Sequence, residues 1–350
     1  MKRYFTIIGC MVLTFIALCG QAQVVNNSVY RALTYSHSAR MAALGGMVLP
    51  MHDGDLQTAL FNPSAIGPGM NDQITLSYIG DFKENTHYAT AQYSHTFEKW
   101  GSFAASVQYN NYGTMTYASE SGYTDGSTFM PSTFAVTLGW GRELTDKWSI
   151  GANLKYLGNQ FEVGRSGALG VDVAATYWSY TNWAFTLAAR NIGYQLYCVE
   201  MNNNERWLPF SLDFTASKKL DHLPLTIIMG YHDIQRWNMT FDDPLDLAEN
   251  YNPLTGEVEK PSKAAQFFNN LGCHLVLGGE LELGKNLVLR LAYNYDTHNK
   301  LDVPKKRSLV GFSAGFGVKI KAFEIDYAYS RSNIVGSPHF LTLRMDLNKF

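Results

Sequence analysis

Apolar and polar residues alternate at every second position along most of the chain beyond residue 70. In segments 103–110, 148–156 and 310–320, aromatic or aliphatic residues fill one set of positions and small or polar residues fill the other. A period of two places these sets on opposite faces of a β-strand. Aromatic residues stand at the ends of the apolar faces, where membrane barrels carry their interfacial girdles. The pattern therefore favours membrane-crossing strands over those of a soluble sandwich.

The alternating segments number about fourteen, and bacterial outer-membrane barrels have an even number of antiparallel strands. The strands are expected to begin near Gln73, His87, Gly101, Ser132, Trp148, Ala168, Trp183, Leu208, Leu225, Cys273, Leu287, Leu309, Phe323 and His339. The sequence thus predicts an all-β fold, a transmembrane outer-membrane β-barrel of about 14 antiparallel strands.

The connections between these segments alternate in length. Short ones centre on residues 98–99, 145–147, 180–182, 221–222, 284–285 and 321–322, and long ones span residues 113–131, 194–207, 235–272 and 296–307. Outer-membrane barrels have short turns at the periplasmic end and long loops at the extracellular end. Both chain ends then fall on the periplasmic side.

A compact stretch precedes the first strand. Ser38 is placed to cap a short helix over residues 39–44, since its hydroxyl accepts a free backbone N–H of the first turn. Gly45 and Gly46 then end this helix, because the residue beyond a helix end often needs a positive φ. The stretch is rich in small residues and mostly uncharged, so it is suited to being enclosed by a larger structure.

A second short helix is expected over residues 56–61, with Asp55 as its cap. Asn62 and Pro63 end it, because the residue before a proline is pushed out of the α region. The stretch could be an ordinary N-terminal subdomain or a plug inside a barrel. The strand pattern that follows favours the plug.

The first residues form a targeting signal. Two basic residues precede the apolar stretch 4–19, and small residues at Gly20 and Ala22 provide a cleavage site. A lipoprotein signal at Cys19 is the alternative, but leucine is a poor fit to the position before that cysteine. The expected organisation is a signal peptide over 1–22, an N-terminal plug with short helices over 23–72 and the barrel over 73–350.

Composition supports a membrane barrel and excludes other classes. The 350 residues carry a formal net charge of −2, which argues against a nucleic-acid binder. No run of about 18 apolar residues follows the N-terminus, so no internal transmembrane helix is expected. The 21 tyrosines, 20 phenylalanines and 30 glycines, with only 17% charged residues, suit a barrel whose faces alternate.

The mature chain keeps two cysteines, Cys198 and Cys273. They could pair in an exported protein, but no local pattern requires it. No spacing of cysteines and histidines resembles a metal site. We therefore expect no cofactor and no metal.

Charges of both signs fall on the faces that point into the predicted barrel: Lys155, Asp172, Arg190, Asp213, Arg290, Glu324, Asp326, Arg344 and Asp346. A wide pore could carry such charges at a constriction. Paired groups that fill a narrow or plugged lumen are the better interpretation, because unpaired charges there would be costly.

The connection over residues 235–272 is the longest, and its length makes it the best candidate for a partner-binding surface. It is acidic, but its spacing matches no known calcium loop. Aromatic residues are common anchors of interfaces, although each ring could also fold back on the barrel rim. The candidates are Trp237, Phe241, Tyr251, Phe267 and Phe268.

The chain ends in Phe350, and a terminal aromatic residue is usual in barrels that are inserted into the outer membrane. Leu341, Leu343, Met345 and Leu347 share one face of the last strand, and Phe350 falls out of phase with them. Phe350 is still the candidate insertion signal.

The N-terminal stretch resembles a known signature. Ser38-Ala39-Arg40-x-Ala42-Ala43-Leu44-Gly45-Gly46 followed by Ala59-Leu60-Phe61-Asn62-Pro63 is similar to the signature of the FadL-like barrels of Bacteroidetes. Residues 29–33, 153–155, 190–193 and 231–237 add to the similarity. The motif residues of the plug are Ser38, Arg40, Gly45, Gly46, Asn62 and Pro63.

The resemblance implies a fourteen-stranded barrel with an N-terminal hatch. It also implies a structural role in the type IX secretion system, whose attachment complex processes secreted cargo and links it to lipopolysaccharide. The implied partners are a PorZ-like surface protein, the sortase PorU and the barrel PorV. None of these follows from the alternation itself.

Three classes of function fit such a chain to different degrees. A non-catalytic anchor would bind a surface partner through its long loops, and an uptake channel for hydrophobic molecules would need an apolar pocket in the lumen. The predicted inward faces are polar and small, which favours the anchor. An enzyme would need serine, histidine and an acid together at the rim, but the nine histidines are scattered and no serine has a recognisable elbow. We expect no enzymatic activity.

Overall fold

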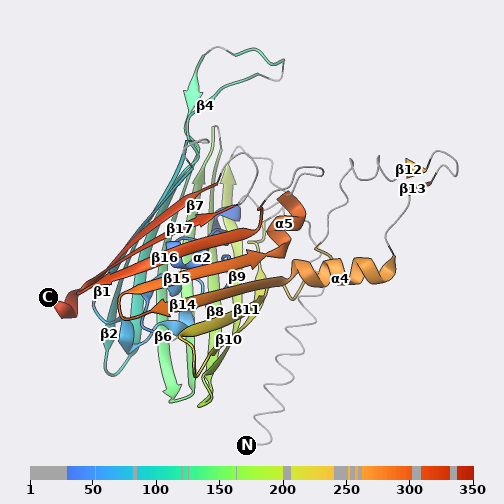
Figure 1. Ribbon diagram of the computed structural model, residues 1–350. Coiled ribbons are helices and arrows are strands. Elements are labelled where there is room, and N and C mark those ends of the chain that lie inside the picture. The colour runs from blue at the N-terminus through green and yellow to red at the C-terminus, as the bar shows by residue number, and fades with distance from the viewer. Residues whose placement is uncertain are drawn as a thin grey trace, which may run out of the picture.

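A closed antiparallel barrel of fourteen strands forms the body of the molecule (Figure 1). This computed structural model describes residues 30–51, 53–81, 85–119, 121–124, 126–162, 164–199, 206–239, 251–252, 257–258, 262–301, 309–331 and 337–350. The predicted signal peptide 1–22 therefore lies outside the described residues. The predicted fold class is confirmed.

Each barrel strand pairs with its sequence neighbours, and β1 closes the barrel against β18. The strands are β1 Gln73–Asp81, β2 Thr86–Phe97, β3 Gly101–Asn111, β6 Ser132–Thr145, β7 Trp148–Gln160, β8 Arg165–Trp178, β9 Trp183–Val199, β10 Ser211–Lys219, β11 Leu225–Tyr231, β14 Leu275–Leu283, β15 Leu287–Asn294, β16 Phe312–Ile320, β17 Phe323–Ser330 and β18 His339–Asp346. Every predicted start lies within three residues of an observed one.

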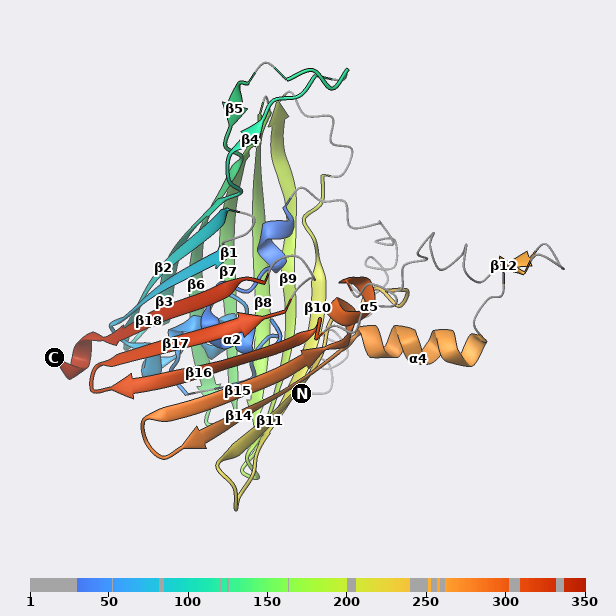
Figure 2. The ribbon, with the colours of Figure 1, turned by 45° about the horizontal axis from the view of Figure 1, so that its top comes forward.

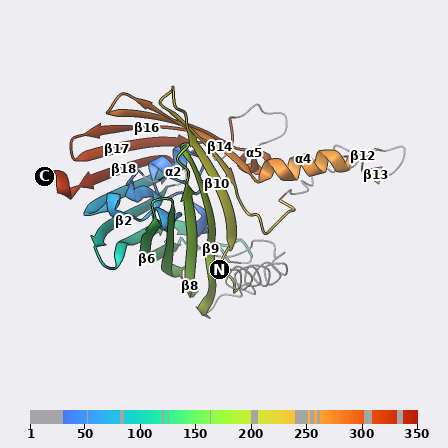
Figure 3. The ribbon, with the colours of Figure 1, turned by 90° about the horizontal axis from the view of Figure 1, so that it is seen from below.

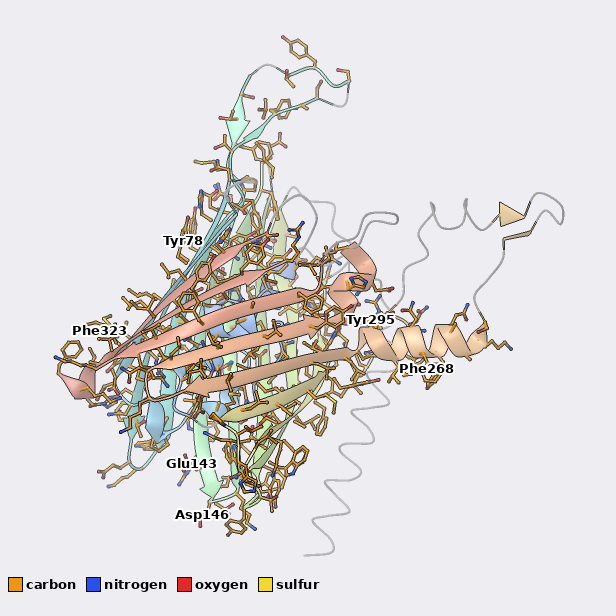
Figure 4. All side chains as sticks on the ribbon, viewed as in Figure 1. Tyr78, Glu143, Asp146, Phe268, Tyr295 and Phe323 are labelled. Carbon is orange, nitrogen blue, oxygen red and sulfur yellow. The ribbon has the colours of Figure 1, made fainter. Side chains whose placement is uncertain are left out.

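The two faces of the strands differ as the alternation predicts. On β3 and β6 the outward Val107 and Leu138 are exposed, whereas the inward Ser106 and Thr137 are buried. In Figure 4, Tyr78 and Phe323 project from the outer surface of the wall, near opposite ends of the strands. An apolar exterior and a polar interior are the arrangement of a membrane barrel.

The short turns gather at one end of the barrel, together with the C-terminus, and the long connections gather at the other end (Figures 1 and 2). Glu143 and Asp146 mark the short-turn end in Figure 4. By analogy with other outer-membrane barrels, we call this end the periplasmic rim and the opposite end the extracellular rim. No helix in the described parts of the chain is long and apolar enough to cross a membrane.

The long connections contain structure of their own. They hold β4 Met115–Thr116, β5 Thr128–Phe129, β12 Tyr251–Asn252, β13 Glu257–Val258, α4 Lys263–Cys273 and α5 Tyr295–Leu301. The last part of the long connection predicted over 235–272 is helical. Ser262 caps α4 by accepting the N–H of Ala265, and good helix formers follow it. Because α4 ends at Cys273, the next strand begins at Leu275.

The N-terminal residues fold into short helical turns: η1 Arg31–Thr34, α2 Ala39–Ala43, η2 Leu56–Thr58, η3 Pro63–Ala65 and η4 Pro68–Met70. The Ser38 hydroxyl accepts the N–H of Met41, and Gly45 and Gly46 have φ of 75° and 77°, as expected from the sequence. The second predicted helix is only the 3₁₀ turn η2, which Asp55 caps through the N–H of Gln57.

Candidate functional site

The N-terminal segment, residues 30–72, crosses the interior of the barrel. Its helix α2 packs against β15, β16, β17 and β18, while η3 packs against β6, β7 and β8 on the other side. Viewed from below, α2 lies within the ring of strands (Figure 3). Tyr30, Leu44, Leu49 and Phe61 of the segment are almost completely buried. The lumen is thus filled by the chain's own residues at this level.

Glycines of the wall give η3 its closest approach to the strands. A Cβ added to Gly151 would lie 2.1 Å from the carbonyl oxygen of Pro63, and one added to Gly141 would lie 2.2 Å from that of Ile66. Only glycine leaves room for a backbone at such distances. The Asn62 side chain fixes this turn, because Oδ1 accepts the N–H of Ser64 and Nδ2 donates to the Leu49 carbonyl.

Arg40 is the centre of a buried ion-pair network on the α2 side. Its guanidinium lies 2.8 Å from Asp55 and 2.5 Å from Asp53, both in the same segment. It also lies 3.0 Å from Glu280 on β14. Burial alone would raise the pKa of the Asp55 carboxyl, but Arg344 and Arg40 together hold that pKa well below its usual value. The Asp55 carboxyl therefore stays ionised, and the Arg40 contacts join the segment to the wall.

The network continues along the wall on β15, β17 and β18. Arg290 lies 2.6 Å from Glu280 and also pairs with Asp326, which accepts a hydrogen bond from Gln57 of η2. Arg344 pairs with Glu324 and reaches Asp55 at 3.5 Å. The predicted inward charges Arg290, Glu324, Asp326 and Arg344 thus lie together in one network.

Four of the other five predicted inward charges form two separate pairs, on β7 to β10. Lys155 lies 2.6 Å from Asp172, and Arg190 lies 2.6 Å from Asp213. The Arg190 guanidinium lies over the ring of Phe61 in the N-terminal segment, 4.5 Å from its centroid. The ninth predicted charge, Asp346, pairs with Lys349 at the periplasmic rim, so all nine have partners.

The sequence placed Arg40 in the plug motif and Asp55 at a helix cap but identified neither as a charge of the lumen. Glu280 and Asp53 were not among the candidates. The alternation on β14 indicates that Glu280 points inward, since it lies on the same face of the strand as the buried Val276. The two aspartates lie in a turn, where no periodicity indicates their direction.

His37 gives the segment a pH-dependent contribution to stability. It is buried, and its ring meets Phe61 edge-on at 6.1 Å between centroids. Burial, with a smaller effect from the charge of Lys155, lowers the pKa of His37 to about 3, whereas an unfolded histidine titrates near about 6.5. The contribution of the neutral ring to stability is complete above the pKa that His37 has in the unfolded state. It is lost as the pH falls from there toward the pKa of His37 in the folded state.

A His37→Phe variant should therefore lose less stability on acidification than the parent protein. We expect its apparent unfolding temperature in detergent to fall less steeply between about pH 7 and about pH 4, because phenylalanine has no proton to bind. Circular dichroism melts across this range measure the effect. If the unfolding temperatures of the two proteins fell in parallel as the pH decreased, this role of His37 would be contradicted.

The extracellular rim carries an exposed aromatic cluster, which we define as Trp237, Phe267 and Phe268. The rings of Trp237 and Phe267 lie 5.2 Å apart, and those of Phe267 and Phe268 lie 5.6 Å apart. Phe268 is 68% exposed, and α4 carries it away from the barrel (Figure 4). Trp237 also packs against His274, whose ring nitrogens contact the carbonyls of His232 and Trp237.

Phe241 lies outside the described residues, and for Tyr251 only the backbone, in β12, is described. Phe350 follows the 3₁₀ turn η5 Leu347–Lys349, so it lies beyond the end of β18 and packs edge-on against Phe323. This turn explains why Phe350 is out of phase. Cys198 and Cys273 are not joined by a disulfide.

Comparison with known proteins identifies the fold. No protein-family model and no curated protein matches the sequence. Among solved structures, the toluene transporter TbuX of Ralstonia pickettii aligns with 91% of this chain and 99% of its own, at 11% identity and a TM-score of 0.55. The Pseudomonas putida toluene transporter TodX aligns with 89% of this chain and 96% of its own, at 12% identity and a TM-score of 0.51.

The monoaromatic hydrocarbon channel CymD gives a similar alignment, with 89% of this chain, 97% of its own, 12% identity and a TM-score of 0.51. At these identities the likeness shows a shared fold. The chain therefore has the fourteen-stranded barrel fold that these hydrocarbon channels share.

Proposed function

We propose that this protein is a non-catalytic outer-membrane barrel of the type IX secretion system, with the role of PorQ. In that role it anchors a PorZ-like surface protein in the attachment complex that contains PorU and PorV. The N-terminal signature supports the wider group, and residues 29–33 and 231–237 support the assignment because they resemble PorQ more than the other barrels of that group.

The observation that carries the anchoring role is the aromatic cluster at the extracellular rim. Trp237, Phe267 and Phe268 are large, exposed and adjacent, and aromatic residues of this kind dominate binding energy at protein interfaces. The first two turns of α4 are exposed on all sides, which makes them accessible to a partner. A rigid barrel that displays such a surface is suited to holding a protein at the cell exterior.

The filled lumen supports the same function. Arg40 joins the N-terminal segment to one wall, and Phe61 with Arg190 joins it to the other. We propose that this segment acts as a plug that keeps the barrel closed. A closed barrel serves an anchor well, whereas a channel has to open during each transport event.

Uptake of hydrophobic molecules is the second candidate, and the fold favours it. The solved structures that share this architecture include toluene transporters and a monoaromatic hydrocarbon channel. An uptake channel should bind toluene and speed its entry into proteoliposomes, while an anchor should do neither. Lysines, arginines and carboxylates on the inward faces weigh against an apolar route through this lumen.

Replacing Phe267 and Phe268 by serine tests the anchoring role directly. We expect the double variant to insert normally, because no barrel strand is changed, and to lose at least tenfold of its co-purified surface partner, since two interface aromatics each contribute more than about 1 kcal/mol. Affinity purification from detergent-solubilised membranes measures the yield.

Tyr180→Ser is the matched control, because Tyr180 is an exposed aromatic residue in a short turn at the opposite rim. It should leave the yield unchanged. Full recovery of the partner with the double variant would exclude this cluster as the binding surface.

A further inference from the structure

A polar cavity of about 210 Å³ lies at the periplasmic rim, far from the aromatic cluster. It is enclosed by the N-terminal segment, the start of β1, the turn between β16 and β17, and the C-terminal residues. Its lining includes Asp53, Gln73, Lys319, Lys321, Arg344 and Lys349. Glu324 and Asp346 also line the cavity, so its side chains carry both signs of charge.

The inner side of the cavity belongs to the Arg40 network and is negative. Three guanidinium groups face five carboxylates in this network, and Lys319 adds only a longer contact of 3.7 Å with Glu324. The members are Arg40, Arg290, Arg344, Asp53, Asp55, Glu280, Glu324 and Asp326. The network is therefore short of positive charge even when Lys319 is counted.

Two groups on this inner side are suited to receiving a hydrogen-bond donor. The Asp53 side chain is 43% exposed, in contrast to the buried carboxylates around it. Gln73 is buried, and its Nε2 donates to the carbonyls of Gly54 and Gly69. Its Oε1 accepts no hydrogen bond from the described residues. A cationic donor placed here would donate hydrogen bonds to both acceptors and would be attracted by the excess negative charge.

The outer side of the cavity is positive. Lys319 and Lys321 come from the end of β16 and the turn that follows it, and Lys349 comes from η5. The Lys349 side chain is 62% exposed, and its contact is Asp346 at 2.6 Å. These three ammonium groups outnumber Asp346, the carboxylate beside Lys349, so they can still attract a phosphate or carboxylate.

We propose that this cavity binds a zwitterion whose primary ammonium group faces Asp53 and Gln73 and whose phosphate or carboxylate faces Lys319, Lys321 and Lys349. Two sources offer this chemistry at the periplasmic rim. One is the phosphoethanolamine headgroup of a phospholipid in the adjacent leaflet, and the other is a free amino acid or peptide end in the periplasm. The site is independent of the proposed anchoring role.

Titration of the full-length protein in detergent tests the proposal with O-phosphoethanolamine, ethanolamine and inorganic phosphate as separate probes. We expect O-phosphoethanolamine to bind at least tenfold more tightly than ethanolamine or inorganic phosphate, as measured by calorimetry. Lys321→Gln combined with Lys349→Gln should weaken it by up to about thirtyfold, since each exposed charge contributes up to about 1 kcal/mol. Lys285→Gln, in another exposed turn at this rim, should have no effect.

Asp53→Asn should remove the preference for the zwitterion over phosphate, because it takes away the carboxylate that faces the ammonium group. Equal binding of phosphate and the zwitterion would indicate an adventitious ion only and would overturn the proposal. Unchanged binding in the double lysine variant would also overturn it, and that variant changes only exposed side chains.

Nanodiscs distinguish the two sources. If the ligand is a lipid headgroup, phosphatidylethanolamine discs should raise the unfolding temperature above that in phosphatidylcholine discs, because choline has no N–H to donate. Added O-phosphoethanolamine should then bind only in phosphatidylcholine discs. If the ligand is soluble, O-phosphoethanolamine should bind equally well in both kinds of disc. Absence of binding in both discs and in detergent would refute the site.

Discussion

Replacing Arg40 by methionine should destabilise the barrel more than any other single change to its charges. The guanidinium contacts Asp53, Asp55 and Glu280, and it is almost completely buried. Methionine has a similar length but no charge, so three carboxylates would lose a common partner. Removing one member of a buried ion pair costs about 3–5 kcal/mol, because the remaining charge stays buried without compensation.

This loss should lower the apparent unfolding temperature by roughly 10 °C and release the N-terminal segment from the wall on the α2 side. Thermal melts in detergent measure the first effect, and single-channel currents in planar bilayers measure the second. The parent protein should show little steady conductance, whereas Arg40→Met should show frequent openings. If the variant fails to assemble, the stability prediction is still met, and Arg40→Lys then supplies the channel measurement.

The unfolding temperature and the channel activity of Arg40→Lys should fall between those of the parent protein and those of Arg40→Met. Lysine keeps the charge, but its single ammonium group does not span three carboxylates as the planar guanidinium does. Lys219→Gln is the control, because Lys219 forms an exposed pair with Glu282 and such pairs contribute at most about 1 kcal/mol. An Arg40→Met protein as stable and as closed as this control would refute the central role of the Arg40 network.

The barrel itself is predictable from the sequence because each strand carries its own evidence. The alternation from Ser102 to Tyr109 can be recognised without knowing the partner strands. A surrounding membrane makes this alternation strict, because the residues that face the lipid have to be apolar. The strand ends are less certain for a physical reason. Phe312 begins β16 later than the alternation from Val310 suggests, because Gly311 has a φ of 90° and breaks the extended conformation.

The lumen is predictable only in part. The alternation identifies which charges point inward, but partners are set by barrel closure and by the course of the N-terminal segment. Arg40 and Glu280 are 240 positions apart in the chain, and no local pattern connects them. Helix α4 is difficult to predict for a different reason. Its cap at Ser262 and its helix-forming residues are visible in the sequence, but they lie inside a long connection with no alternation to mark where structure begins.

Replacing Gly151 by valine should displace the N-terminal segment from the opposite wall. The added Cβ would stand 2.1 Å from the Pro63 carbonyl oxygen and 2.7 Å from the Ser64 nitrogen, both backbone atoms of η3. Backbone cannot move aside as a flexible side chain can, so η3 has to shift as a unit. That shift would break the contacts of Ser64 with Ser149 and Thr176, each with an oxygen–oxygen distance of 2.6 Å.

We expect Gly151→Val to lower the apparent unfolding temperature and to make the N-terminal segment sensitive to protease added at the periplasmic rim of reconstituted barrels. Overpacking of this kind costs about 1–3 kcal/mol, and the broken hydrogen bonds add about 1 kcal/mol each. Gly279→Ala is the matched control, because a Cβ there would meet its nearest neighbour at an ordinary 3.7 Å. Its segment should stay protected. Equal protection in both variants would mean that the small size of Gly151 is not needed to hold the N-terminal segment in place.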